Sequence, residues 1–285
     1  MKAIKTTVGV LAGLLYLVSV NQAAAEHVLY KKQLPAKGTI YIETKTVSMN
    51  NCAVTLETQG QKGNGTITRA GQRIAVTTFD SDTQITVEIK KDSSKGRAPM
   101  IGKRMPEKED KEPLHGKLVI LTQTEGVWTG KLKEGEATAE QQKKIDKIAD
   151  QYNGKDDNAQ IYGSISRQVG DSWDVDPSKL SSFGDDAKKL EGTFKVTFKG
   201  IENVKGEDCA VLIADIDVKG ATEAKNGTMS IKAKARILRS LKNRVDLENK
   251  IEGELTMENT LNQGTGTMKI AGPMVSLSKT EVKVP

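Results

Sequence analysis

Histidine and cysteine are almost absent from the sequence, with two residues of each among 285. Neither His27 nor His115 has a cysteine or an acidic motif at the spacing of metal ligands. Ser172 has no glycine two residues later, so the sequence contains no nucleophile elbow there. Aromatic residues make up 4% of the chain, which leaves no visible platform for stacking bases. The sequence therefore predicts no catalytic residue, no metal site, no cofactor and no nucleic-acid partner.

Long apolar runs are also missing, with one exception near the N-terminus. Lys2 and Lys5 precede an apolar run over residues 8–20, and three alanines follow at 23–25. This order is typical of a secretory signal peptide, and the run is shorter than the roughly 20 residues of a membrane-spanning helix. We therefore interpret residues 1–25 as a cleaved signal. We expect an exported protein, periplasmic or extracellular, with no membrane span after cleavage.

No sign of charge dominates the chain. The formal net charge is +6, and acidic and basic residues alternate along most of the sequence. Hydrophobic residues make up 36% and charged residues 28%. This composition is sufficient for a folded core and excludes a fibrous, wholly disordered or polytopic membrane protein.

Short alternating segments rich in Val, Ile and Thr recur along the chain and predict β-strands. They cover residues 39–45, 52–58, 73–79, 83–90, 117–123 and 127–132, and the pattern returns from residue 192. Residues 91–113 interrupt it with three prolines and dense mixed charge. We predict a long exposed loop there, either a solvated connector or an element that binds a partner.

One clear helix is predicted between the two groups of strands. Thr138 and Gln141 have the spacing of a capping box, and Asn153-Gly154 supplies a C-terminal stop. The apolar residues between these signals follow at helical intervals and form one stripe, which we expect to lie on a sheet: Ile145, Ile148, Ala149 and Tyr152. Asp176-Pro177 predicts the start of a short second helix.

The strongest pattern lies in two successive strands near the C-terminus. Residues 229–237 alternate an apolar face with a basic one, and residues 245–257 alternate an apolar face with an acidic one. If residues 239–242 form the hairpin loop, Lys234 and Arg236 lie beside Asp246 and Glu248. The apolar face includes the small residues Ala233, Ala235 and Gly253. We expect one dry and one wet side on this sheet.

Three short motifs recur in the same order in both halves of the chain. They are Gly38-Thr39, Cys52-Ala53-Val54 and Asn64-Gly65-Thr66, repeated as Gly192-Thr193, Cys209-Ala210-Val211 and Asn226-Gly227-Thr228. The repetition suggests two related β halves, 26–133 and 192–285, joined by a helical connector over 134–191. In an oxidising compartment we expect a Cys52–Cys209 disulfide, the alternative being two buried thiols. The two Asn-Gly-Thr motifs match glycosylation sequons, and hairpin turns explain both equally well.

Gly170-Asp171-Ser172-Trp173, with the strand ending in Thr129-Gly130-Lys131-Leu132 and the helix that follows it, resembles a group of uncharacterised secreted bacterial proteins. That resemblance carries no activity, and we expect a turn at Gly170-Asp171 and a packing role for Trp173 on a sheet face. The expected class is α+β, mostly β, with one or more curved antiparallel sheets and one or two covering helices. This architecture resembles the lipoprotein-carrier half-barrels of the bacterial envelope.

These features lead to three hypotheses on function. The first is a non-enzymatic binding protein that holds an apolar ligand or a lipidated partner on its curved sheet, with Ala233, Ala235, Gly253 and Trp173 at the site. The second is an envelope structural or assembly module that acts through surface loops and sheet edges. The third is a hydrolase with a carboxylate pair such as Asp171 and Asp174, which composition alone suggests.

Overall fold

The computed structural model describes residues 25–58, 60–97, 107–180, 187–222, 227–261 and 266–285. Its main feature is one antiparallel sheet of 12 strands, accompanied by a pair of very short strands, β1 (His27–Val28) and β8 (Ser166–Arg167). The strands of the main sheet are β2 (Ile40–Thr58), β3 (Gln61–Ser81), β4 (Gln84–Gly96), β5 (Lys108–Lys111), β6 (Lys117–Thr124), β7 (Val127–Leu132), β9 (Ser172–Asp174), β10 (Ala187–Val204), β11 (Glu207–Thr222), β12 (Thr228–Ser240), β13 (Asp246–Leu261) and β14 (Gly266–Lys283). The expectation of a mostly β protein with a curved antiparallel sheet is confirmed.

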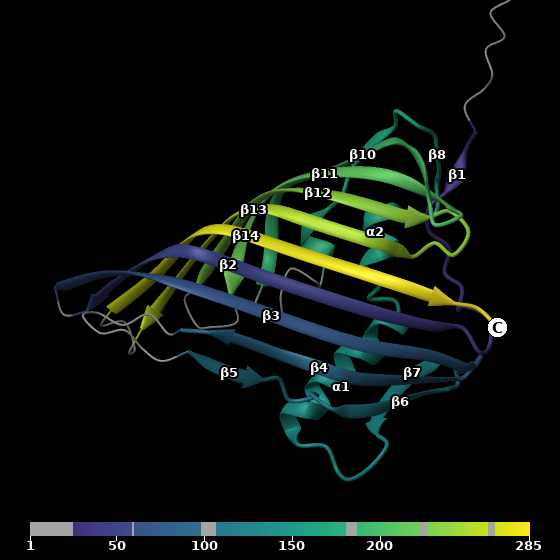
Figure 1. Cartoon of the computed structure of the whole chain (residues 1–285), viewed down its shortest axis with the longest axis horizontal. Helices are drawn as coiled ribbons and strands as arrows, with labels where there is room; N and C mark the ends of the chain where they lie inside the picture. Colours follow the sequence, from purple (N-terminus) through teal and green to yellow (C-terminus); the bar gives the residue numbers. More distant parts are fainter. Residues whose placement is uncertain (1–24, 59, 98–106, 181–186, 223–226, 262–265) are drawn as a thin grey trace, which may run out of the picture.

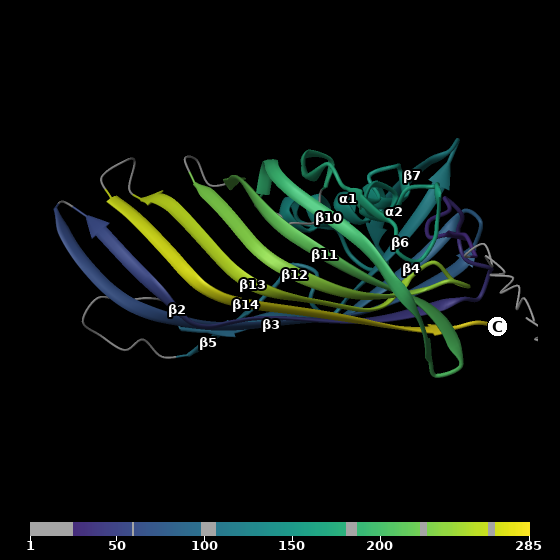
Figure 2. The ribbon, with the colours of Figure 1, turned by 90° about the horizontal axis from the view of Figure 1, so that it is seen from above.

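Strands from both halves of the chain share this sheet. The order is β7-β6-β4-β3-β2-β14-β13-β12-β11-β10-β9, with β5 on the side of β4 (Figure 1). The C-terminal strand β14 pairs with the early strand β2 and so joins the two halves. Within the described residues β7 and β9 are the two ends of the order and do not pair, so the sheet is curved but unclosed (Figure 2).

Side-chain alternation decides which side of the sheet is dry. In β12, Met229, Ile231, Ala233, Ala235 and Ile237 are buried, whereas the lysines between them are exposed. The buried set faces the concave side, where it joins alternate residues of β10 and β11 in the main core cluster. The expected one-sided amphipathic sheet is therefore present.

Helix α1 (Ala139–Tyr152) covers one part of the concave face (Figure 2). Thr138 caps it in a capping box with Gln141, as the sequence predicts. Its buried residues pack on β4, β6 and β7 in a second core cluster. Close approach to β7 depends on Gly130, because an added Cβ there would lie 2.5 Å from Ile145 Cγ2.

A second part of the concave face is covered by irregular chain and short helices. These are the segment around Leu29, helix α2 (Asp157–Tyr162) and the 3₁₀ turn η1 (Pro177–Lys179). The sequence predicts η1 from Asp176-Pro177 but gives no signal for α2. Among the described residues, no helix is long and apolar enough to cross a membrane.

The structure corrects the prediction of a long loop over residues 91–113. Strand β4 continues to Gly96, and β5 pairs with it from Lys108 to Lys111, while residues 98–106 lie outside the described residues. These extensions have polar side chains on both sides, and none of their residues belongs to a hydrophobic core cluster. Apolar alternation, the signal used to find strands, is therefore absent from them.

The predicted register of the β12–β13 hairpin is also wrong. Lys234 lies opposite Glu252 and Arg236 opposite Lys250. The reason is that Arg239, which was expected in the exposed loop, is buried inside the protein, and the connection moves to residues 241–245. Asn64 is likewise in β3 opposite Thr55 and not in a hairpin turn. Asn226 lies outside the described residues.

The expected disulfide is not formed, and Cys52 and Cys209 are both free and buried. Cys52 lies on β2 and Cys209 on β11, with β14, β13 and β12 between them. Four steps of about 4.8 Å exceed the roughly 7 Å limit for bridged Cα atoms. Cys209 also faces away from the main core, in a small cluster with Val211 and Leu238. The structure therefore agrees with the alternative expectation, in which the two cysteines are buried thiols.

Candidate functional site

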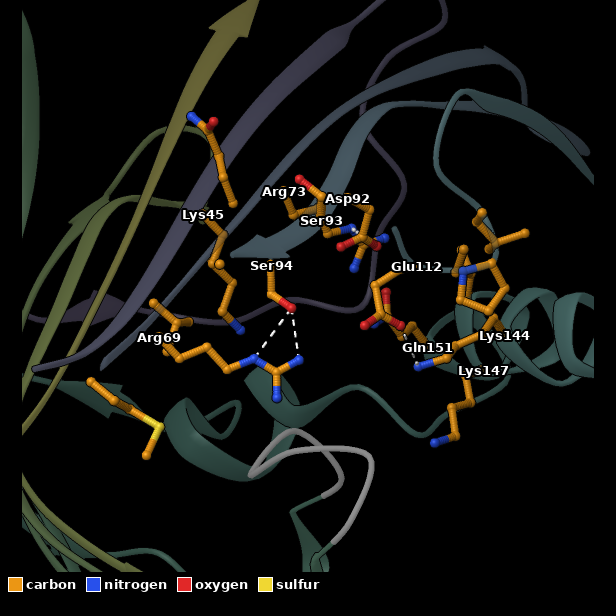
Figure 3. Close-up of a pocket in the computed structure, with 17 residues that line it drawn as sticks. Lys45, Arg69, Arg73, Asp92, Ser93, Ser94, Glu112, Lys144, Lys147 and Gln151 are labelled. Carbon is orange, nitrogen blue, oxygen red and sulfur yellow. Dashed lines mark hydrogen bonds and ion pairs between the residues drawn. The ribbon is translucent and has the colours of Figure 1, made fainter. Parts of the chain in front are cut away.

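A hollow lies on the concave side, between the sheet and α1 (Figure 3). Its volume is about 640 Å³, within the range of small-molecule sites. We call it the basic hollow. Its floor comes from β2, β3 and β4, and its wall comes from residues 112–114 and one side of α1.

Three cross-strand rows make up the floor of the basic hollow. In the first row Arg69 of β3 is opposite Met49, in the second Gly71 is opposite Val47, and in the third Arg73 is opposite Lys45. Strand β4 continues the rows with Gly96, Ser94 and Asp92. Because side chains alternate along a strand, the basic groups of the first and third rows point to the same side. Gly71 leaves open space between the two arginines.

Arg69 is held across the floor by a hydroxyl group. Its Nε and Nη2 atoms donate to Ser94 Oγ at 3.2 and 2.7 Å (Figure 3). The position opposite, Gly96, allows this arrangement, since an added Cβ there would lie 3.1 Å from Arg69 Cγ and 2.9 Å from Thr68 O. Asp110 on β5 has its pKa lowered chiefly by a hydrogen bond from Lys108, with Arg69 a smaller electrostatic cause.

The third row contains the one acidic residue of the floor. Arg73 Nε lies 3.9 Å from Asp92 Oδ2, too far for a hydrogen bond. Lys45 lies opposite Arg73 on the neighbouring strand β2. It forms no ion pair with any residue in the described part of the chain. The floor therefore carries three positive side chains and one carboxylate.

Helix α1 supplies two further lysines. Lys144, Lys147, Ile148 and Gln151 are spaced along one side of the helix and line the wall. Lys144 Nζ lies 3.9 Å from Glu112 Oε2, and Gln141 Nε2 donates to Pro113 O at 3.0 Å, which ties the helix to the rest of the wall. Figure 3 shows Lys144 and Lys147 on the opposite side of the hollow from Lys45 and Arg69. Among the described residues, five basic and two acidic side chains line the hollow.

The concave face next to the hollow is apolar and half-buried. Met49, Met257, Met268, Met274 and Leu56 are partly buried and pack against the core clusters from β2, β13 and β14. We call them the methionine strip. Met49 belongs to both surfaces, since it lines the hollow and is opposite Met274. The two surfaces are therefore continuous.

The residues predicted to bind a ligand lie in the same cross-strand rows as the hollow. From Arg69 the first row runs through Met49, Met274, Gly253 and Ala233. The second row runs from Gly71 through Ala235 and ends at Trp173 on the edge strand β9. Ala233 and Ala235 are buried in the main core, under the segments that cover this part of the sheet. They are neighbours of the open surface and do not line the hollow.

Trp173 is partly buried against the main core cluster. Its Nε1 donates to Ile161 O at 2.7 Å, and the Arg167 guanidinium lies 4.6 Å from its ring centroid. The turn expected before it is present, because Gly170 has a φ of +100° and the Gln168 backbone N–H donates to the Asp171 carboxylate at 2.9 Å. Asp174 is exposed on β9. Neither Asp171 nor Asp174 lines the hollow.

Sequence reasoning missed the basic hollow. The signal was present as Arg69, Gly71 and Arg73 at a spacing of two, which places all three on one side of a strand. It was not recognised because the strand was predicted to begin at Arg73 and β4 to end at residue 90. The convergence of Lys144 and Lys147 on the same space depends on how α1 packs, which the sequence does not reveal.

No protein-family model matches the chain, and no curated protein sequence matches it. Solved structures with a similar course of chain include lipovitellin, described for its lipid–protein interactions, at 9% identity and a TM-score of 0.40. The match covers 87% of this chain but 26% of the lipovitellin chain. A DUF1329 family protein from Desulfovibrio piger matches at 10% identity over 87% of this chain and 86% of its own, with a TM-score of 0.18. A β-barrel-like DUF1849 protein from Brucella abortus matches at 7% identity over 88% and 100%, with a TM-score of 0.20. All three TM-scores are too low to transfer a function.

Proposed function

We propose that this protein is a non-enzymatic binding protein that holds an apolar ligand, or the lipid part of a partner, on the concave face of its sheet. The observation that carries the proposal is the methionine strip. A row of large apolar side chains that stays partly exposed on a hollowed surface is typical of a binding surface. Methionine is also the side chain that adapts best to ligands of differing shape.

The course of the strands supports this use of the strip. In Figure 2 the long strands β2, β3, β13 and β14 continue well past α1 and α2, which cover only one end of the concave face. Around Ala233 and Ala235, by contrast, the covering segments bury the same face. The apolar surface is therefore divided into a packed core and an open part, and the open part is the binding surface in this proposal.

The test is to express the protein with its own N-terminal segment in a bacterial host, purify it without detergent and record native mass spectra, followed by organic extraction. We expect a bound apolar mass. The double variant Met49→Gln/Met274→Gln should lose that mass, whereas Val127→Gln, at a position 57% exposed on β7, should retain it. An unliganded wild-type protein with nothing in the extract would contradict the proposal.

Export belongs to the same proposal, because a lipid carrier or lipid-binding module of the envelope must leave the cytoplasm. Residues 1–24 of the predicted signal lie outside the described residues. N-terminal sequencing of the protein from the periplasm or medium tests this point. We expect a new terminus at Glu26, and an intact Met1 in a cytoplasmic fraction would contradict it.

A further inference from the structure

We propose that the basic hollow receives the negatively charged headgroup of an amphiphile whose apolar part lies on the methionine strip. This inference rests on the proposed function and adds the chemical class of the ligand. In the part of the chain that the structure describes, five basic side chains and two acidic ones line the hollow. An anion placed there gains from this excess of positive charge, which an uncharged apolar ligand would not use.

The donors of the floor are available for an anion. Arg69 hydrogen-bonds to the neutral hydroxyl of Ser94 and to no carboxylate among the described residues, and its electrostatic effect on Asp110 is a minor one. A guanidinium has five N–H donors, and only two contacts are made with Ser94. Lys45 has no ion pair within the described residues. These two groups lie beside Gly71, whose missing side chain leaves the space that a headgroup would occupy.

The apolar surface beside the hollow favours an amphiphilic ligand. Met49 lines the hollow and is opposite Arg69 on one side and Met274 on the other. A molecule with its anion at Arg69 therefore has apolar surface one strand away, in the direction of β14 and β13. The volume of about 640 Å³ is also larger than a single small anion needs. A phosphate or a carboxylate headgroup satisfies the same donors.

The test measures binding of short-chain lipids below their micelle concentration by isothermal titration calorimetry. The probes are dihexanoyl phosphatidylglycerol, which is anionic, dihexanoyl phosphatidylcholine, which is zwitterionic, and glycerol 3-phosphate, which has no chains. We expect phosphatidylglycerol to bind about tenfold or more tightly than the other two, with a preference that weakens at high salt. The double variant Lys45→Gln/Arg69→Gln should abolish the preference.

Two further variants serve as controls. Lys232→Gln/Lys234→Gln removes the same charge from the convex face of β12 and should leave the preference intact. Gly71→Leu retains every charge but fills the hollow, and its new Cβ meets nothing closer than 3.8 Å. It should weaken phosphatidylglycerol about tenfold if the hollow holds the headgroup. It also provides the test if the charge variant fails to fold.

The outcomes separate this inference from the proposed function. Equal binding of both lipids, unchanged by Lys45→Gln/Arg69→Gln and by Gly71→Leu, would overturn the headgroup site and leave the apolar binding surface in place. Binding of neither lipid would overturn both proposals. If glycerol 3-phosphate binds as tightly as phosphatidylglycerol, the hollow is a site for free anions. That result would overturn the inference that the ligand is an amphiphile.

Discussion

The guanidinium of Arg239 lies over the ring of Tyr162, 3.8 Å from its centroid, and both side chains hydrogen-bond to the carboxylate of Asp246. Arg239 is 1% exposed, and its Nε donates to Leu29 O at 2.7 Å. The group therefore joins the N-terminal segment, α2 and the β12–β13 hairpin. It fixes the cover over one part of the concave face, so the extent of the open part depends on it.

The first prediction concerns this buried charge. Arg239→Leu should lower the free energy of unfolding by about 3–5 kcal/mol, because it leaves Asp246 without its cationic partner and Leu29 O without its donor. Arg236→Leu, three residues earlier on the same strand, removes an exposed pair with Glu202 and should cost less than about 1 kcal/mol. Urea unfolding of both variants measures the difference. Equal losses would show that the buried network adds nothing.

Stability should fall in alkaline solution. Burial raises the pKa of Tyr162 well above its usual value, and burial followed by Asp156 raises that of Tyr30 to about 12. The unfolded chain then releases these protons first, so full stability holds below about pH 10 and is lost as pH rises toward the folded-state pKa values.

For Tyr162 the expected slope is about 1.4 kcal/mol per pH unit above about pH 10. Urea unfolding at a series of pH values measures it. The variant Tyr30→Phe/Tyr162→Phe, which has no hydroxyl to titrate at either position, should show a flatter dependence. A variant with the same slope as the wild type would assign alkaline unfolding to other groups.

Enlarging a residue should cost more stability in the core than in the hollow. Ala235 is 3% exposed among core side chains, so Ala235→Leu should destabilise the protein by about 1–3 kcal/mol. Gly71→Leu should change stability by less than about 1 kcal/mol, because its side chain enters open space. Thermal unfolding of the two variants tests the contrast. A neutral Ala235→Leu would reveal unfilled space above the predicted small residues.

The two thiols should remain reduced without a reductant. Burial raises the pKa of both Cys52 and Cys209, which lowers the fraction of reactive thiolate. We expect slow labelling by a thiol reagent in the native protein and two thiols per chain in denaturant. An intact mass two hydrogens light would show that the chain can bring β2 and β11 together.

Much of the fold follows from the sequence where one side of an element is buried. The alternation in β12 and the capping box at Thr138 each have a local physical cause, and both are confirmed. The polar end of β4 and strand β5 gave no such signal. The register of β13 could not be predicted because it depends on Arg239, whose partners Leu29 and Asp246 are distant in the chain or across the hairpin.

The candidate site was less predictable than the fold. Small residues leave room on a dry face, which is why the sequence predicts a site at Ala233, Ala235 and Gly253. In the structure, the segments around Leu29 and Tyr162 fill the space above Ala233 and Ala235. The basic hollow requires Arg69 from β3 and Lys147 from α1 to line the same space from opposite sides. That arrangement depends on tertiary packing alone.

The unpaired ends of the sheet, β7 and β9, have a mechanical consequence. In a closed barrel the number of strands and their stagger determine the diameter, and a larger guest requires that hydrogen bonds break. In this open sheet, a small change of twist at each strand pair adds up from β7 to β9. The sum alters the width of the concave face while the hydrogen bonds between strands stay intact. If the concave face binds an apolar ligand as proposed, bending of the open sheet would fit ligands of different widths without local unfolding.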